Sequence, residues 1–317
     1  MTSVHDRLLH LGNVVVDLVL TVPRLPDRGG DVLATSARTA PGGGLNVMVA
    51  AANQGLQVAY GGAHGTGPHG DLSRAAMRAA GISVLLPPKP DLDTGLVVTM
   101  VDAEGERTFV TSPGAEATLG PVDLALVRPT AGDMVYLSGY SMLHSANRAA
   151  LTAWLRALPE AIAVAFDPGP LVRDIPAHSV RRLLARADWL SCNAQEAEHL
   201  TGHRAPAQAA TALTRSMARG RAVVRNGPDG CHVTPHRTAD SVHVDGFRVR
   251  AVDLNGAGDA HTGTFLAALA TGADPLRAAR TANAAAALAV TAHGSATAPR
   301  ADRLDAFLRQ HPAATGR

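Results

Sequence analysis

Cysteine is nearly absent from this chain of 317 residues, which has only Cys192 and Cys231. Disulfide frameworks and structural zinc sites need paired Cys or Cys/His spacings, and two isolated thiols provide neither. The 14 histidines also lack metal-binding spacings such as H-E-x-x-H. We therefore expect reduced, buried thiols and a cytoplasmic protein without a Cys or His metal centre.

Aromatic residues are also scarce, at 3% of the chain, and 29 basic residues nearly balance 27 acidic ones for a formal charge of +2. Nucleic-acid surfaces need clustered basic residues and stacking rings, so we expect a small-molecule partner and no nucleic acid. Asn13 and Asp17 interrupt the apolar stretch 8–22, and no basic-then-apolar leader precedes it. We therefore expect neither a membrane span nor a signal peptide.

The chain contains a single lysine, Lys89, which lies in a Pro-Pro-Lys-Pro stretch and not in a glycine-rich loop. A P-loop requires the lysine of G-x-x-x-x-G-K-[ST] to reach the phosphates of a nucleotide. Protein kinases likewise need a lysine supported by a glycine-rich loop. Both mechanisms of nucleotide binding are excluded.

Apolar β-branched runs alternate with helical patterns along most of the chain. Strands are predicted at 8–16, 57–62, 134–138, 162–166, 189–192, 222–225 and 231–234, and helices at 45–54, 146–158, 179–187, 194–200, 207–219, 260–271, 275–291 and 301–308. This alternation indicates an α/β fold, in which helices cover both faces of a mostly parallel sheet.

Two segments, at about 18–40 and 94–112, contain short strands and turns without helices between them. A hairpin turn is expected at 102–105. These segments predict a small β-sheet lid on the main sheet. With no internal repeat or long linker, residues 1–317 are expected to form a single domain.

The most informative motif is Asp-Leu-Asn-Gly-Ala-Gly-Asp at 253–259, followed by an apolar helical run. Gly256 and Gly258 let the backbone turn sharply, and the free N–H groups of the helix start favour a phosphate. Asp259 in the first turn would be an ionised carboxylate beside this cradle, which suits phosphoryl transfer. The alternative is an ordinary helix N-cap, and the motif alone does not decide.

Two further motifs could face the same ligand. Asp17 emerges from a buried strand, where an unpartnered carboxylate is costly, although it could simply cap a turn. The run Pro41-Gly42-Gly43-Gly44-Leu45-Asn46 lets a ligand approach the backbone and offers an amide to a sugar hydroxyl. A flexible connector is the plainer interpretation of the glycines.

Motifs also follow two later strands. Asn193 and Glu196 have the spacing of a helix capping box, which the residues alone do not separate from a carboxylate holding magnesium through water. The turn 225–230, Arg-Asn-Gly-Pro-Asp-Gly, lies at a strand end, where ligands gather in parallel sheets. In isolation it reads as a plain turn.

Two other patterns are typical of a dinucleotide site and of a hydrolase, and we reject both functions. Residues 65–70 match the dinucleotide pattern G-x-G-x-x-G, but Pro68 and His69 crowd the turn and no ribose-binding acid follows the next strand. The stretch Ser-Gly-Tyr-Ser at 138–141 lacks the glycine spacing of a nucleophile elbow, which disfavours a hydrolase.

Taken in order, these motifs resemble those of the ribokinase-like carbohydrate kinases, the PfkB family, over nearly the whole chain. The resemblance implies a ribokinase-like three-layer α/β/α sandwich and ATP-dependent phosphoryl transfer, with magnesium, to a hydroxyl of a sugar or nucleoside. It implies that Asp259 is the base and that the anion hole is formed by Gly256, Ala257 and Gly258. Substrate hydroxyls would be bound by Asp17, Gly42, Gly43 and Asn46.

The resemblance further implies a nucleotide site and a moving lid. The nucleotide would contact Asn193, Arg225, Asn226, Gly227, Gly230 and Asn283, with Glu196 near magnesium. The lid would close over the sugar and exclude water. Because lids in this family often pair, a homodimer is expected.

The chain also departs from the family pattern. Leu254 and Asn255 stand where many members have threonines, and His261 replaces a common phenylalanine. Ala298 stands where ribokinases place a hydroxyl ligand for a monovalent cation, so potassium activation is doubtful although Asp253 is present. These departures leave the identity of the sugar open.

Three functions are compatible with these residues. The first is an ATP-dependent kinase of a small sugar. The second is a nucleoside kinase, which would need an apolar or stacking wall that the few aromatics make harder to build. The third is a catalytically silent sugar-binding regulator, against which the intact cradle and Asp259 argue.

Overall fold

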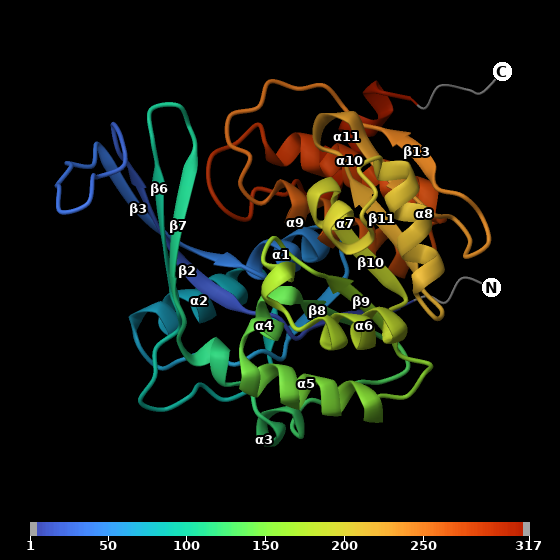
Figure 1. The fold of residues 1–317 in the computed structure, drawn as a ribbon, viewed down its shortest axis with the longest axis horizontal. Coiled ribbons are helices and arrows are strands. Elements are labelled where there is room, and N and C mark those ends of the chain that lie inside the picture. Colours follow the sequence, from blue (N-terminus) through green and yellow to red (C-terminus); the bar gives the residue numbers. More distant parts are fainter. Residues whose placement is uncertain (1–4, 313–317) are drawn as a thin grey trace.

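The computed structural model describes residues 5–312 and folds them around a nine-stranded sheet (Figure 1). Its order is β13-β12-β11-β10-β9-β8-β1-β4-β5. The parallel strands are β1 (Arg7–His10), β4 (Gln57–Tyr60), β5 (Ser83–Val84), β8 (Asp133–Ser138), β9 (Ala163–Asp167), β10 (Trp189–Asn193) and β11 (Arg221–Arg225). Antiparallel β12 (Gly230–Val233) and β13 (Val242–Asp245) complete one edge.

Alternate residues of each strand enter two separate cores, because successive side chains point to opposite faces. Leu9, Val135 and Phe166 pack under α3 (Pro121–Leu124), α4 (Gly139–Leu143), α5 (Ser145–Ala157), α6 (Ala177–Arg186), α7 (Ala194–Thr201) and α8 (Pro206–Ser216). Leu8 and Met134 pack under α1 (Leu45–Asn53), α2 (Pro68–Ala79), α9 (Ala257–Ala270) and α10 (Pro275–Ala289), and α11 (Ala301–Gln310) packs against α10. The predicted α/β fold with both faces covered is confirmed.

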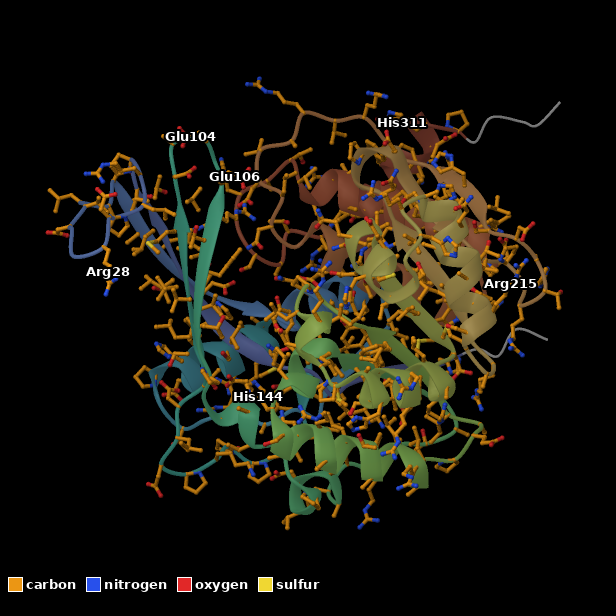
Figure 2. The ribbon with its side chains drawn as sticks, viewed as in Figure 1. Arg28, Glu104, Glu106, His144, Arg215 and His311 are labelled. Carbon is orange, nitrogen blue, oxygen red and sulfur yellow. The ribbon has the colours of Figure 1, made fainter. Side chains whose placement is uncertain are left out.

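A second sheet of four strands stands apart from the first, at the left of Figure 1. It has the order β3-β2-β6-β7 and comprises β2 (Val14–Thr21), β3 (Ser36–Gly43), β6 (Leu96–Val101) and β7 (Arg107–Ser112). Its β6–β7 hairpin rises beside the loop that precedes α9, and Glu104 and Glu106 mark the hairpin tip in Figure 2. We call this sheet the lid.

The prediction of one strand over 8–16 is wrong. The chain leaves the main sheet after His10, and Gly12 turns it so that its N–H donates to Nδ1 of His10 at 3.1 Å. Val14 then begins a lid strand paired with β3 and β6. Val14 and Val16 are fully buried at this junction, so the apolar pattern continues across the break and hides it.

Helix α2 was not predicted, although it begins at the rejected dinucleotide pattern. Pro68 occupies its first turn, and the carboxylate of Asp93 accepts from the N–H groups of His69 and Gly70 at 3.0 and 2.8 Å. A protein carboxylate therefore already fills the anion site of this helix start. Rejecting a nicotinamide site here agrees with that geometry.

The two cysteines are free and buried, as expected. None of the helices within residues 5–312 is both long and apolar enough to cross a membrane.

Candidate active site

An anion cradle forms where α9 begins, three residues earlier than the predicted start at 260. Gly256 is the N-cap and has a φ of +73°, a left-handed conformation that favours glycine. The N–H groups of Gly258 and Asp259 have no backbone acceptor within residues 5–312, as is usual in a first helical turn. The start of α9 therefore offers free donors and the positive end of its dipole to an anion.

Asp259 is a half-buried carboxylate in the first turn of α9. Asn46 of α1 donates from Nδ2 to Oδ2 of Asp259 at 3.0 Å, while its Oδ1 accepts from the N–H of Ala296 at 2.8 Å. Burial raises the pKa of Asp259 to about 6, although the bond from Asn46 opposes the shift. Such a carboxyl is mostly ionised at neutral pH and is a stronger base than an exposed aspartate.

Asp17 and the glycine loop lie beside Asp259, where the lid joins the main sheet. Burial raises the pKa of Asp17 to about 6, and the charge of Arg38 partly opposes this. A Cβ at Gly42 would collide with the Asp17 carboxylate, and Gly43 has a φ of +61°. Glycine is therefore needed at both positions to bring the loop against this carboxylate.

Asn193 and Glu196 form a complete capping box at the start of α7. Oδ1 of Asn193 accepts from the N–H of Glu196 at 2.8 Å, and Oε2 of Glu196 accepts from the N–H of Asn193 at 2.8 Å. Burial raises the pKa of Glu196 to about 7, and the charge of Asp167 adds to the shift. Asn193 and Glu196 therefore cap α7, and the nearby carboxylate of Asp167 also affects the protonation of Glu196.

Arg225 connects the strand ends beneath the cradle. Its Nη1 donates to Asp167 at 3.0 Å, Ser191 at 2.7 Å and Thr262 at 2.6 Å, and Nη2 lies 3.7 Å from Glu196. Burial alone would lower the pKa of Arg225, but the two carboxylates outweigh it and raise the pKa. A permanent buried positive charge therefore lies among the acidic groups of the site.

The remaining predicted nucleotide residues lie near the β11–β12 turn. Asn226 donates its N–H to the carbonyl of Gly230 at 2.7 Å, and Gly227 and Gly230 have φ of +59° and +97°. Asn283 on α10 donates to the carbonyls of Val244 and Asp245 at 2.9 and 3.0 Å. Both side-chain donations of Asn283 therefore hold β13, and the side chain is buried between α10 and this strand.

Sequence reasoning missed Asp167 and Tyr140, which the structure brings to the same place. Asp167 ends β9 and pairs with Arg225, and Tyr140 follows β8. Burial raises the pKa of Tyr140 to about 12, and the charge of Asp259 contributes. Both positions follow a predicted strand, so the rule that ligands gather at carboxyl ends of parallel strands would have found them.

Both oxygens of the Asp253 carboxylate accept two hydrogen bonds each. Its Oδ1 accepts from the N–H of Asn255 at 2.9 Å and from Arg107, and its Oδ2 accepts from the N–H of Gly294 at 3.1 Å and from Arg38 at 3.4 Å. Burial would raise the pKa of Asp253, but these donors lower it to about 2. Two lid strands are thereby tied to the loop that precedes the cradle.

This arrangement does not fit a monovalent cation at Asp253. Both carboxylate oxygens already accept from cationic and N–H donors, and Ala298 packs its methyl group among Ala50, Ala260 and Ala289. His261, the other departure, is buried, and burial followed by the charge of Arg225 lowers its pKa to about 3. Its ring is therefore neutral at physiological pH.

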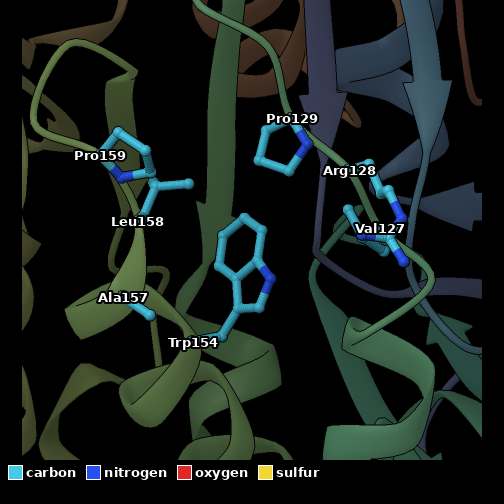
Figure 3. Close-up of a pocket in the computed structure, with 7 residues that line it drawn as sticks. All are labelled: Val127, Arg128, Pro129, Trp154, Ala157, Leu158 and Pro159. Carbon is cyan, nitrogen blue, oxygen red and sulfur yellow. The ribbon is translucent and has the colours of Figure 1, made fainter.

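A surface groove lies away from these residues, beside Trp154 of α5 (Figure 3). It has a volume of about 330 Å³ and is lined by Val127, Arg128, Pro129, Trp154, Ala157, Leu158 and Pro159. The groove contains no carboxylate and none of the predicted site residues, so it does not supply the chemistry described above.

Comparisons with known proteins identify the family of this chain. A model of the pfkB family carbohydrate kinases matches residues 6–302. The chain is 34% identical to the ATP-dependent ribose-1-phosphate kinase of Halopiger xanaduensis, covering 96% of this chain and 98% of that protein. It is 28% identical to the ribokinase of Bacillus subtilis, covering 90% and 93%.

A solved structure gives the same result. The aminoimidazole riboside kinase of Salmonella enterica, complexed with aminoimidazole riboside and an ATP analog, has a TM-score of 0.76 at 27% identity, covering 96% of this chain and 99% of that one. The expected ribokinase-like fold is thereby confirmed.

Proposed function

Because this chain belongs to the pfkB family of carbohydrate kinases, and is an ATP-dependent phosphotransferase acting on a sugar hydroxyl, we propose that Asp259 is its catalytic base. The observation that carries this proposal is the pairing of a half-buried carboxyl of raised pKa with free N–H donors in one helical turn. The carboxylate takes the proton, and the donors stabilise charge on the transferred group.

The chemical step follows from this pairing. As the acceptor oxygen forms its bond to the γ-phosphorus, its proton passes to the carboxylate of Asp259. The bond between the γ-phosphorus and the bridging oxygen breaks, and ADP leaves with that electron pair. The anion hole of Gly256, Ala257 and Gly258 would donate toward the transferred phosphoryl, for which the N–H of Ala257 would have to exchange its 3.4 Å bond to the carbonyl of Leu254 for the phosphoryl oxygen. Asn46 keeps the base in one orientation.

We propose that magnesium is held through water by Glu196 and Asp167. No group of three or more His, Cys, Asp or Glu residues in the described part of the chain is arranged to hold a metal. Hard carboxylate oxygens nevertheless suit magnesium, and a cation opposite this buried pair would favour its ionised forms. When bound, magnesium neutralises charge on the nucleotide phosphates.

The acceptor we propose is a pentofuranose, held at its hydroxyls by Asp17, Gly42, Gly43 and Asn46. Support comes from names of the relatives, since ribose-1-phosphate kinase, ribokinase and aminoimidazole riboside kinase share a ribose unit. The nucleotide would lie along Asn193, Arg225, Asn226, Gly227, Gly230 and Asn283. A nucleoside acceptor is the second candidate, favoured by the riboside kinase structure.

We also propose that the enzyme works in the cytoplasm, where ATP is supplied, and as a homodimer joined through its lids. Support for the dimer is the exposure of Phe109 and Val110, apolar residues of the lid edge strand β7. Light scattering on the purified protein measures the mass and decides between one chain and two.

ADP release from Mg-ATP, measured across pentoses, hexoses, sugar phosphates and nucleosides, tests the function. Turnover on free ribose or a ribose phosphate supports the proposal, and turnover on nucleosides alone would favour the second candidate. Silence on all of them, with measurable sugar binding, would favour a non-catalytic protein.

Turnover should not depend on potassium. Arg107, Arg38 and two N–H groups occupy the Asp253 carboxylate, so no oxygen there remains for a cation. We expect the same kcat in potassium, sodium or choline chloride at equal ionic strength. A clear rise specific to potassium would contradict the absence of a cation site at Asp253.

The variant Glu196→Gln should distinguish the capping role of Glu196 in α7 from its proposed role in holding magnesium. Glutamine can still accept from the N–H of Asn193 through its oxygen, so the backbone bond of the cap is retained, while the bond that Nδ2 of Asn193 donates to Oε1 of Glu196 at 2.8 Å is lost. Losing the carboxylate should raise the magnesium concentration for half-maximal activity by about tenfold or more. Glu198→Gln, at a partly exposed position on the same helix, is the control. An unchanged magnesium titration would leave Glu196 with the capping role alone.

A further inference from the structure

Two arginines and Asp17 share one face of the lid. In the sheet register Arg38 pairs with Val19, two residues from Asp17, and Arg107 pairs with Val101, which pairs with Thr21. Since side chains alternate between faces with a period of two, these three side chains leave the same face. That face meets the loop before the cradle, as the contacts of both arginines with Asp253 require.

The contacts with Asp253 use only a small part of what the two arginines offer. Each guanidinium has five N–H donors, and only Nη2 of Arg38 and Nη2 of Arg107 have a partner within residues 5–312. The side chains remain 44% and 26% exposed. Asp253 also accepts two backbone N–H groups, so a single guanidinium would suffice to pair its charge.

The guanidinium of Arg38 borders the proposed acceptor site. Its charge acts on the carboxyl of Asp17, and its Nη1 lies against Gly294. The same loop continues to Ala296, whose N–H is bound by Asn46, the partner of Asp259. A ligand that reaches Asp17 and Asp259 therefore lies within reach of a surplus positive charge on the lid.

We propose that the acceptor carries a phosphate monoester, which Arg38 and Arg107 bind through their unused donors. This inference rests on the proposed kinase function and narrows its substrate to a pentose phosphate. A neutral sugar offers the unused donors only uncharged hydroxyl oxygens, whereas the charged oxygens of a phosphate accept from guanidinium groups in pairs and more strongly. The arginines bind and orient the acceptor; the transferred phosphoryl still goes to a free hydroxyl, and the product is a bisphosphate.

The experiment compares D-ribose, ribose 1-phosphate and ribose 5-phosphate as acceptors for Mg-ATP, with ADP release as the readout. We expect one of the phosphates to exceed ribose in kcat/KM by about 100-fold, the effect of charge-assisted hydrogen bonds from two guanidinium groups. Arg38→Gln and Arg107→Gln should each lower kcat/KM for that phosphate by about 10- to 100-fold, mainly through KM. The loss on ribose should be much smaller.

Arg28→Gln is the matched control. Arg28 is an exposed arginine in the β2–β3 loop, labelled on the lid in Figure 2, and has no partner at Asp253. We expect its kinetics to match those of the unchanged protein. Far-UV circular dichroism reports whether each variant is folded, and Arg38→Gln, at the more exposed position, carries the test if Arg107→Gln unfolds.

The outcomes separate this inference from the proposed function. A preference for ribose, or equal losses on ribose and its phosphates, would mean that the arginines only hold the lid against Asp253. If no acceptor releases ADP, the kinase assignment fails. Calorimetry would then still test the anion site. Binding of ribose 1-phosphate by the unchanged protein that is lost in Arg107→Gln would support the site, and no binding by the unchanged protein would overturn it.

Discussion

Asp259→Asn should reduce kcat/KM by about 10²- to 10⁴-fold, the range expected for loss of a general base. Asparagine has nearly the same shape and keeps an oxygen for the Nδ2 donor of Asn46, which lies 3.0 Å from Asp259. Removing a partly buried charge of raised pKa should leave the free energy of unfolding equal or slightly higher. The expected loss is therefore chemical and not structural.

Steady-state kinetics and calorimetric binding of the acceptor measure the two consequences separately. The acceptor should bind the variant as tightly as the unchanged protein. Asp305→Asn, an exposed position on α11, controls for the substitution itself. Turnover that survives in Asp259→Asn would refute the base assignment and return this residue to a helix-start role.

The pH dependence of the unchanged protein follows from the same group. The pKa of Asp259 is raised to about 6, and only the ionised form takes a proton. Activity should therefore be fully present above that value and should fall by about tenfold per pH unit below it. Asp17 and Glu196 also titrate between about 6 and 7, so a steeper acid limb would report their contribution.

Much of the fold and of the site could be predicted because the signals are local. Alternating strand and helix patterns predict the covered parallel sheet, and glycines at 256 and 258 before an apolar run predict a helix start with free N–H groups. Asn193 and Glu196 have the spacing of the capping box that the structure contains. In each case a few neighbouring residues determine the geometry.

What could not be predicted depends on contacts between distant residues. The break between β1 and β2 lies inside one apolar run, and only the two different sheets reveal it. Arg107 and Asp253 are 146 positions apart, and Arg225 and Asp167 are 58 apart. No spacing in one sequence indicates such pairs, so the lid contact and the charged network emerge only from the tertiary structure.

Arg225→Met should lose both stability and activity, because this arginine is the sole cation within the described part of the chain to contact Asp167 and Glu196. Methionine replaces the aliphatic part of the side chain but leaves two buried carboxyl groups facing each other. Breaking a buried ion pair from one side costs about 3–5 kcal/mol in the free energy of unfolding. Activity should fall as well, because the guanidinium packs beneath Gly258 of the cradle. A Cβ added to Gly258 would lie 3.5 Å from Cζ of Arg225.

The destabilisation should depend on pH in a direction that identifies its cause. Burial and Asp167 already raise the pKa of Glu196 to about 7, and loss of the opposing Arg225 charge raises it further. In the variant the carboxyl groups therefore bind protons in the folded state that they release on unfolding. The cost should consequently shrink as the pH falls toward the ordinary carboxyl range and grow as it rises.

Chemical denaturation at several pH values measures this, with Arg221→Met as the matched control. Arg221 begins the same strand but lies over the ring of Trp189 at 4.3 Å and donates to the carbonyl of Pro235, far along β11 from the carboxylates. Its loss should cost about 1 kcal/mol and leave the pH dependence and kcat unchanged. A cost for Arg225→Met that is equal at all pH values would mean that the methionine disturbs packing, and that the carboxylates do not need this charge.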